Sequence, residues 1–160
     1  IKNNSILSFM RLVIQRVLQA SVSIGGQVKD QIDGGLLVLL GIESSDVEED
    51  ADYLCKKLVN LRIFGDAEGK MNLSILDTAG DILLISQFTL FAQTQKGNRP
   101  SFIRAARPEQ AVPLYEYCVR QLHTLTSRRI ATGEFGADMK VALINDGPVT
   151  VVIDSRQRDF

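Results

Sequence analysis

The sequence has almost none of the side chains on which most hydrolytic centres depend. Its 160 residues include one histidine, two cysteines and no tryptophan. A Ser-His-Asp triad needs a histidine beside its nucleophile, and a zinc site needs several His, Cys or acidic ligands. His123 follows Leu122 in the middle of a predicted helix, where we expect it to face solvent. We therefore expect neither a triad nor a metal site, and no cofactor.

Long hydrophobic runs and a net charge are also missing. No apolar run approaches the ~20 residues that span a membrane. The formal net charge is −1, so any contact with nucleic acid must come from a local basic cluster. Cys55 and Cys118 fall on apolar faces of predicted helices, and no secretory signal is present. We expect both to be reduced core residues rather than a disulfide.

The length of the chain is typical of one domain. Residues 1–9 lack an initiator methionine, and they fit neither a signal peptide nor the pattern that follows. Met10 resembles a functional start. We therefore interpret residues 1–9 as an extension outside the fold.

The expected strands are alternating or continuously apolar segments bounded by turn residues. Helical spacing predicts two amphipathic helices, one over residues 46–60 with a capping-box pattern at Ser45 and Glu48. The other helix starts close to Glu109, because Pro113 is tolerated only near a first turn. Strands and helices do not alternate regularly, which predicts an α+β fold. The expected strands are residues 11–24, 27–32 (after a turn at Gly25-Gly26), 36–40, 62–64, 71–75, 82–85, 140–144 and 149–154.

One strand end has an unusual composition. Residues 82–85 are continuously apolar, which is typical of a strand buried on both faces, and Ser86, Gln87 and Thr89 follow directly. Buried polar groups are costly unless they find partners. This strand end either opens into a pocket where a ligand supplies those partners, or its polar groups bind the local backbone. The segment alone does not decide between the two.

The most basic part of the chain follows. Lys96, Arg99, Arg104 and Arg107 lie within twelve residues of a polar, glycine-containing segment. Such a segment is either a phosphate-binding loop or an ordinary solvated loop, and without further context the second interpretation is favoured.

Four motifs together point to a family. They are Ser-Gln-Phe-Thr at 86–89, Asn-Asp-Gly-Pro-Val-Thr at 145–150, Gln-Arg-Val at 15–17 and Arg-Pro-Ser-Phe at 99–102. Each is weak alone, but in this combination the chain resembles the D-aminoacyl-tRNA deacylases from Met10 to about Asp154. The resemblance defines one deacylase domain over residues 10–154 and leaves residues 155–160 as a C-terminal tail.

The resemblance implies a homodimer of compact, β-barrel-like subunits with a mixed-sheet core and two main flanking helices. It implies active sites at the dimer interface and a cytoplasmic enzyme. The expected reaction is hydrolysis of the ester between a D-amino acid, or mischarged glycine, and the terminal adenosine of tRNA. L-Aminoacyl-tRNA is expected to be rejected. The expected partners are the acceptor end of aminoacyl-tRNA and a second subunit, with no membrane and no DNA.

The resemblance also implies roles for individual residues. The reaction site is expected to be lined by Ser86, Gln87, Phe88 and Thr89, and the terminal adenine to be held by Phe135 and Met139. Gly147-Pro148 is expected to be a cis dipeptide that reaches into the partner's pocket. Arg16 is expected to fix this dipeptide, and Asn145 to belong to the same substrate-binding group.

An aminoacyl ester is an activated acyl group, so orientation and stabilisation of the oxyanion go far toward its hydrolysis. We assign positioning to Gln87, Phe88 and Thr89, and oxyanion stabilisation to backbone N–H groups near Phe88. The vicinal 2′-hydroxyl of the terminal ribose can assist from within the substrate. Thr89 as a covalent nucleophile is the alternative, but the sequence shows no base to activate its hydroxyl.

Two other functions remain open from the residues. A non-catalytic RNA- or DNA-binding module fits the basic segment and the lack of a catalytic histidine, but it does not need Ser86 and Thr89 at a buried strand end. A hydrolase of free D-amino acid esters or peptides does not need an adenine-sized pocket. Deacylation of matched D- and L-aminoacyl-tRNA distinguishes the three.

Overall fold

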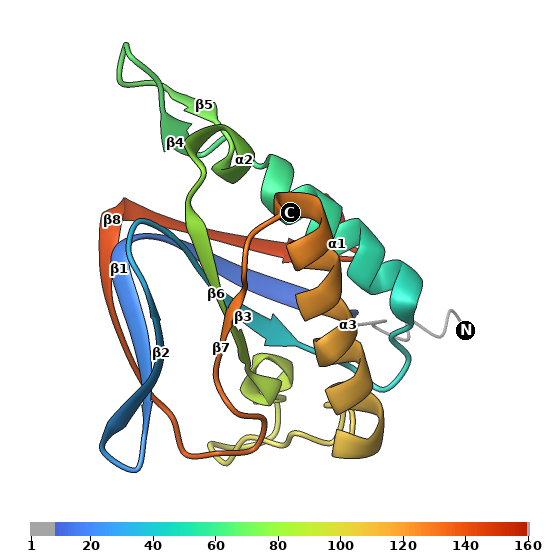
Figure 1. Ribbon diagram of the computed structural model, residues 1–160. Coiled ribbons are helices and arrows are strands. Elements are labelled where there is room, and N and C mark those ends of the chain that lie inside the picture. Colours follow the sequence, from blue (N-terminus) through green and yellow to red (C-terminus); the bar gives the residue numbers. More distant parts are fainter. Residues whose placement is uncertain (1–8, 160) are drawn as a thin grey trace.

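The computed structural model describes residues 9–159, which form a curved mixed sheet covered on one side by helices (Figure 1). This arrangement confirms the predicted α+β class. The two main helices, α1 and α3, pack against each other over the sheet, and α2 is a single turn. The elements are β1 Arg11–Ile24, β2 Gln27–Ile32, β3 Gly35–Gly41, α1 Glu48–Asn60, β4 Phe64–Gly65, β5 Met71–Leu73, α2 Ile75–Thr78, β6 Asp81–Ser86, the 3₁₀ turn η1 Phe88–Phe91, α3 Pro108–Thr126, β7 Ala131–Thr132 and β8 Lys140–Asp154.

β1 organises the sheet because it pairs with three other strands. Its second half forms the predicted hairpin with β2, and Gly25 and Gly26 supply the positive φ angles of the turn, 59° and 79°. Its first half pairs antiparallel with β3, and β8 runs along its other edge. β2 and β3 therefore follow each other along one edge of β1.

The sheet curls until β7 approaches β2. β3, β6 and β7 are parallel neighbours. The Asp30 carboxylate of β2 accepts the Thr132 N–H of β7 at 3.0 Å and pairs with Arg129 at 2.8 Å. Lys29 donates to the Thr132 carbonyl oxygen at 2.9 Å. Side chains thus bridge the last gap, and the sheet forms a nearly closed barrel, as the family resemblance implies.

The central strands are buried on both faces, as their apolar runs predict. On β3 and β6, Leu36 and Leu84 face α1 and α3, whereas Leu37 and Leu83 face the barrel interior. The Tyr115 hydroxyl of α3 donates to the Leu84 carbonyl oxygen at 2.7 Å and ties this helix to β6.

The start of α1 differs from the prediction, whereas the start of α3 agrees with it. The Ser45–Glu48 capping box is wrong: Val47 precedes the first turn of α1, and the Asp50 carboxylate accepts its N–H at 3.0 Å. The Ser45 hydroxyl instead donates to the Glu43 carboxylate at 2.6 Å. α3 starts at Pro108, one residue from the predicted Glu109, and Pro113 lies inside the helix, on its exposed side.

The two predicted C-terminal strands are one strand. The pairs Gln15–Thr150 and Val17–Asn145 leave residues 146–149 opposite a single residue of β1. The turn-like residues therefore form a wide bulge in β8 instead of a connection between two strands. Three further elements differ from the prediction. β7 was not predicted, and the strand predicted over 62–64 lies at Phe64–Gly65. The segment predicted as a strand over 71–75 divides into β5 and the start of α2.

Among the described residues, those near both ends of the chain pack against the domain. Ser155, predicted as the start of a tail, is buried and donates from Oγ to Asp50 at 2.8 Å, and Arg156 pairs with Asp50 at 2.9 Å. Residues 1–8 of the predicted extension lie outside the described residues. Phe9 is buried beneath the Arg156 guanidinium, whose Cζ lies 4.3 Å from the ring centroid.

Cys55, Cys118 and His123 lie in the surroundings predicted for them. Cys55 and Cys118 are buried free cysteines, and the Cys55 Sγ lies 3.9 Å from the Cys118 carbonyl oxygen. His123 is exposed, with Nδ1 2.8 Å from the Arg128 carbonyl oxygen. Across residues 9–159, no group of three or more His, Cys, Asp or Glu side chains is arranged to hold a metal ion. None of the helices in this part is long and apolar enough to cross a membrane.

Candidate active site

The polar motif predicted at the end of a buried strand lies where β6 leaves the core. Ser86 is the last residue of β6 and pairs with Leu40 of β3. The Gln87 N–H then donates to the Leu40 carbonyl oxygen at 2.8 Å, and the chain turns into η1. Thr89 is consequently exposed in this turn. The strand end does open to the surface.

Gln87 and Thr89 form a hydrogen-bonded pair. The Gln87 side-chain amide donates to Thr89 Oγ1 at 2.5 Å. An amide has no basic lone pair for a proton, so it orients the Thr89 hydroxyl without activating it as a nucleophile. The hydroxyl keeps its own proton for donation to a ligand. This geometry favours the positioning role over the covalent one.

The backbone of η1 presents donors at the same place. The first bond of the turn runs from the Leu90 N–H to the Gln87 carbonyl oxygen at 3.2 Å. The N–H groups of Phe88 and Thr89 precede it, and the first N–H groups of a helical turn have no acceptor within the turn. They are suited to stabilise an oxyanion beside Thr89.

An apolar cavity of about 470 Å³ adjoins this turn. Phe88 is 52% exposed and packs edge-on against Phe102, with ring centroids 5.2 Å apart and an interplanar angle of 79°. Phe135 lines the same cavity from the segment after β7. Three aromatic residues far apart in the sequence therefore meet beside the reaction motif. Phe102 was predicted only as part of the Arg-Pro-Ser-Phe motif; its signal in the sequence is the apolar pair Phe102 and Ile103 inside a basic loop.

The two predicted adenine-binding residues occupy different places. Phe135 lines the aromatic cavity and also a neighbouring one of about 390 Å³ beside α3. Met139 packs with the barrel interior instead. A Cβ added at Gly133 would overlap Met139 Sδ and lie 3.2 Å from Ile85 Cδ1, so Gly133 allows Met139 to lie against β6. Met139 therefore packs in the barrel interior and does not line the aromatic cavity.

The Gly147-Pro148 motif is the exposed centre of the bulge in β8. The bond between the two residues is cis, as expected, and Gly147 has a φ of 145° that favours glycine. Asn145 spans the bulge, because its Oδ1 accepts the Val149 N–H at 2.8 Å. From β1, Arg16 Nε donates to the Asp146 carbonyl oxygen at 2.9 Å. Arg16 and Asn145 thus hold the two ends of the bulge.

Within one copy of the chain the bulge and the reaction motif are far apart. Arg16, beside the bulge, pairs with Leu36 at the start of β3, whereas Ser86 pairs with Leu40 near its end. Four residues along a strand correspond to about 13 Å, and β1 and β6 are also separated by β3. The bend of β8 and η1 accordingly lie at opposite ends of the subunit (Figure 1). A site that uses both motifs requires two copies of the chain.

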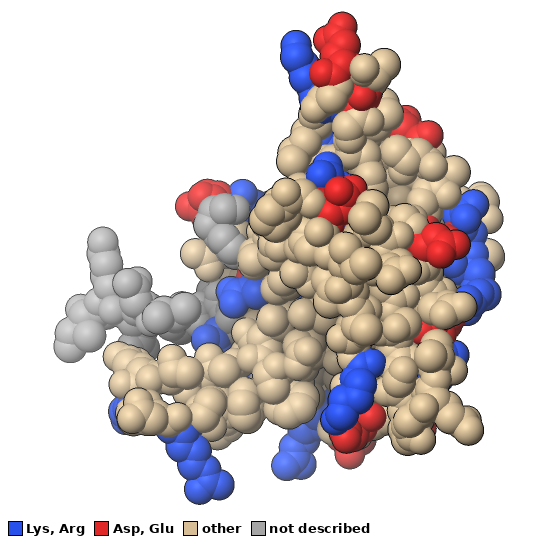
Figure 2. Space-filling model, turned by 90° about the vertical axis from the view of Figure 1, so that its left-hand side faces the viewer, with Lys and Arg blue, Asp and Glu red and all other residues tan. Residues whose placement is uncertain are grey.

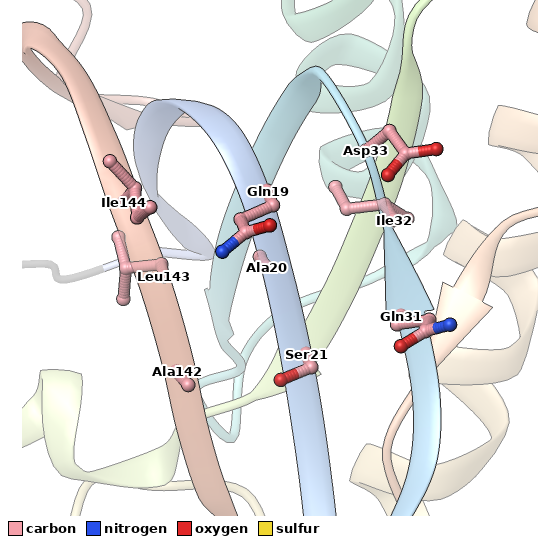
Figure 3. A pocket seen from close by; sticks show the side chains of 9 residues that line it. All are labelled: Gln19, Ala20, Ser21, Gln31, Ile32, Asp33, Ala142, Leu143 and Ile144. Atoms are coloured by element: carbon pink, nitrogen blue, oxygen red, sulfur yellow. The ribbon is translucent and has the colours of Figure 1, made fainter.

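A separate hollow of about 410 Å³ lies on β1, β2 and β8 (Figure 3). Polar side chains such as Gln19, Ser21 and Gln31 line it together with Ile144, and none of the predicted site residues does. The predicted site residues therefore favour the aromatic cavity, and not this hollow, as the candidate active site.

Comparison with known proteins gives a consistent result. The model of a family described as D-Tyr-tRNA(Tyr) deacylase matches residues 13–154. Proteins named D-aminoacyl-tRNA deacylase from Akkermansia muciniphila and Bacteroides thetaiotaomicron are each 59% identical over 150 residues, which cover 94% of this chain and all of the relative.

Two solved structures are also similar. One, named c-Myc DNA Unwinding Element Binding Protein, has a TM-score of 0.84 at 40% identity, covering 90% of this chain and 97% of that one. The other, described as a probable eukaryotic D-amino acid tRNA deacylase, has a TM-score of 0.79 at 17% identity, covering 91% and 98%. The second comparison supports the fold alone.

The matches therefore define the chain as a hydrolase that acts on the ester bond of aminoacyl-tRNA. Within that class, the chain belongs to the D-Tyr-tRNA(Tyr) deacylase family.

Proposed function

We propose that this protein hydrolyses the ester between a D-amino acid and the 3′-terminal adenosine of tRNA, and leaves L-aminoacyl-tRNA intact. The observation that carries this proposal is the junction of η1 with the aromatic cavity. Phe88 belongs to both, so a base stacked near Phe88 and Phe135 places its ribose ester beside Gln87 and Thr89. Stacking on aromatic side chains is a common mode of binding unpaired RNA bases.

The proposed mechanism relies on positioning. The ester carbonyl oxygen accepts from the Phe88 and Thr89 N–H groups, which stabilise the charge that develops when water attacks the carbonyl carbon. The Thr89 hydroxyl, held by Gln87, orients the acyl group. The vicinal 2′-hydroxyl of the substrate relays the proton of the attacking water to the leaving 3′-oxygen as the C–O bond breaks.

The bulge of a second subunit is the proposed source of chiral selection. Gly147 and Pro148 are exposed and held by Arg16 and Asn145, so they form a firm projection that can enter a partner's pocket. An L-side chain directed at this projection is excluded, whereas a D-side chain directed away from it is accepted. Glycine has no side chain to exclude and is accepted as well.

A homodimer is part of this proposal. The face formed by β8, β1 and β2 shows a broad area with few charged side chains (Figure 2). Leu18, Ile144 and Val152 on β1 and β8 are 57%, 48% and 38% exposed. Exposed apolar residues on these strands favour an interface with a second copy of the chain. A monomeric mass at micromolar concentration together with full activity contradicts the dimer.

A nucleic-acid-binding function without catalysis is the second candidate. The similar structure at 40% identity carries the name of a DNA-binding protein, and the basic loop suits polyanions. The polar strand end beside an aromatic cavity favours the deacylase, which we place in the cytoplasm.

The decisive experiment compares purified protein on matched D- and L-aminoacyl-tRNA of the same tRNA. We expect rapid release of the D-amino acid and a rate on the L-form close to spontaneous hydrolysis. Equal rates on both enantiomers, or no activity on either together with tight DNA binding, exclude the proposed function.

A further inference from the structure

The loop between η1 and α3 differs from the rest of the chain in its charges. Residues 82–108 contain no Asp or Glu, but they contain Lys96, Arg99, Arg104 and Arg107. Elsewhere, five arginines pair with carboxylates, as in Arg128–Asp81 and the ion pairs of β1, β2 and the C-terminus. Within residues 9–159, by contrast, no carboxylate forms an ion pair with Lys96, Arg99 or Arg107.

The loop has a defined base. Gln93 and Ser101 exchange two backbone hydrogen bonds, of 2.7 and 3.0 Å, so residues 94–100 form a closed turn. The Arg104 carbonyl oxygen accepts the Ser44 N–H at 3.3 Å, which joins the loop to the segment before α1. The cations are therefore presented from an anchored frame.

A hollow of about 620 Å³ lies on this loop. It is lined by Lys96, Arg99 and Arg104 together with amide and hydroxyl groups of Gln93 and Ser101, among others. Cations interspersed with neutral hydrogen-bond donors are the groups that bind phosphate oxygens and sugar hydroxyls.

Neighbouring residues of one loop line the basic hollow and the aromatic cavity. Phe102 and Ile103 line the aromatic cavity, while Ser101 and Arg104 on either side of them line the basic hollow. Arg107 lines the aromatic cavity close to Phe135. A chain of nucleotides that ends in the aromatic cavity can therefore pass directly over the basic loop.

We propose that residues 93–107 bind the phosphodiester backbone of the single-stranded acceptor end of tRNA. In this proposal, which rests on the proposed function, Arg107 contacts the phosphate of the terminal adenosine. Lys96, Arg99 and Arg104 contact the phosphates that precede it. The loop recognises the backbone and not the bases, so it contributes affinity for any tRNA.

The test compares two substrates that carry the same reactive ester. The first is D-aminoacyl-tRNA, and the second is a D-aminoacyl-adenosine without phosphates. The variant Lys96→Ala/Arg99→Ala removes two exposed cations and leaves the aromatic cavity unchanged. We expect a higher KM for the tRNA substrate at low salt, and unchanged kinetics on the adenosine ester.

The salt dependence gives a quantitative expectation. Each phosphate contact on a single strand contributes about 0.7 to the slope of log K against log salt. Two contacts therefore account for about a 7-fold change between 50 and 200 mM salt. We expect the KM of the unmodified protein to rise about 7-fold more than that of the variant over this range.

The variant Lys56→Ala/Lys70→Ala is the matched control, because it removes the same charge from α1 and from the β4–β5 turn. In Figure 1 the β4–β5 turn lies at the end of the molecule opposite the basic loop. Equal losses in both variants indicate a general effect of net charge and overturn the proposal. An equal loss on both substrates overturns it too, because the loop then acts on the ester site.

Direct binding of deacylated tRNA, which carries no amino acid, separates this proposal from the proposed function. Weaker binding by Lys96→Ala/Arg99→Ala supports the loop assignment even if no ester is hydrolysed. Unchanged binding of deacylated tRNA overturns it. Duplex DNA that competes as strongly as tRNA for the loop overturns the assignment to an RNA acceptor end.

Discussion

Arg16 of β1 lies opposite the bulge of β8 and donates from Nε to the Asp146 carbonyl oxygen at 2.9 Å. Its other arm donates from NH1 to the Ile63 carbonyl oxygen at 2.6 Å, so one guanidinium joins the bulge to the segment after α1. The geometry agrees with the expectation that Arg16 fixes the Gly147-Pro148 motif. Its role in catalysis remains a prediction.

Arg16→Lys tests that role. A lysine keeps the charge, but one ammonium cannot reach both carbonyl oxygens with the planar geometry of the guanidinium. We expect a loss of about 1–3 kcal/mol in the free energy of unfolding. We also expect the ratio of D- to L-aminoacyl-tRNA hydrolysis to fall about 10-fold, because a looser bulge excludes the L-side chain less well. A drop in both rates with an unchanged ratio contradicts a role in selection.

Gly147→Ala places a methyl group in the bulge itself. The new Cβ would lie 2.7 Å from Val149 Cγ2 and 2.9 Å from the Val149 nitrogen, at a φ of 145° that side chains rarely adopt. We expect at least a 10-fold loss of kcat/KM on D-aminoacyl-tRNA, because the strained bulge changes its shape. Steady-state kinetics on D-aminoacyl-tRNA measure this loss.

Gly69→Ala is the matched control for this variant. Gly69 also has a positive φ, 78°, but nothing lies within 4 Å of its Cβ position in the β4–β5 turn. We expect it to lower stability by about 1 kcal/mol and to leave activity unchanged. Equal activity losses in the two variants indicate general backbone strain instead of a specific role for the bulge.

Local sequence patterns predicted the elements whose conformation depends on their own residues alone. The apolar run over residues 82–85 and the Gly25-Gly26 turn each specify their own conformation, and the structure confirms both. The family motifs identified Phe88 and Phe135, but their meeting at one cavity depends on how the barrel closes. No local pattern contains that information.

The misassigned elements have non-local causes. The segment 145–148 resembles a turn between strands, yet both arms pair with β1, so the pairing partner decides that β8 is one strand. β7 has two residues and no periodicity, and it exists because β6 lies beside it. The N-cap of α1 is Val47 and not Ser45, since Ser155 and Arg156 hold the Asp50 carboxylate where it accepts the Val47 N–H.

Thr89 distinguishes positioning from covalent catalysis. If its hydroxyl only orients the acyl group, Thr89→Val lowers kcat about 10-fold and Thr89→Ser retains most of the activity. Replacing the 2′-hydroxyl of the terminal ribose with hydrogen costs more than 100-fold, because the proton relay is lost. Steady-state kinetics on the normal and 2′-deoxy substrates measure both effects. Complete loss of turnover in Thr89→Val, with an acyl group trapped on Thr89 of the unmodified protein, establishes the covalent route instead.

Asp46 makes the stability of the domain depend on pH. It is 3% exposed, and burial, reinforced by the nearby charges of Asp50 and Glu43, raises its pKa to about 7. The N–H groups of Met10 and Glu43 donate to its carboxylate at 2.8 and 2.7 Å and oppose this rise only in part.

The folded protein therefore keeps a proton on Asp46 that the unfolded chain loses above its ordinary pKa of 3.8. Since the folded state binds more protons, the free energy of unfolding falls as pH rises from about 4 to about 7. The fall contributed by Asp46 is about 4 kcal/mol at most, roughly 1.4 kcal/mol for each pH unit. Asp46→Asn cannot ionise, so we expect it to remove this slope in urea unfolding curves between pH 4 and 8.

Asp30→Asn is the control, because Asp30 has the opposite shift. The hydrogen bond from Arg129 lowers its pKa to about 2, against the cost of burial. Its stabilising contribution is complete above pH 3.8 and is lost only as pH falls toward 2. Between pH 4 and 8, Asp30→Asn should therefore lower stability by a constant amount and leave the slope unchanged. A slope that persists in Asp46→Asn would show that Asp46 is ionised in the folded protein, as its two N–H donors favour.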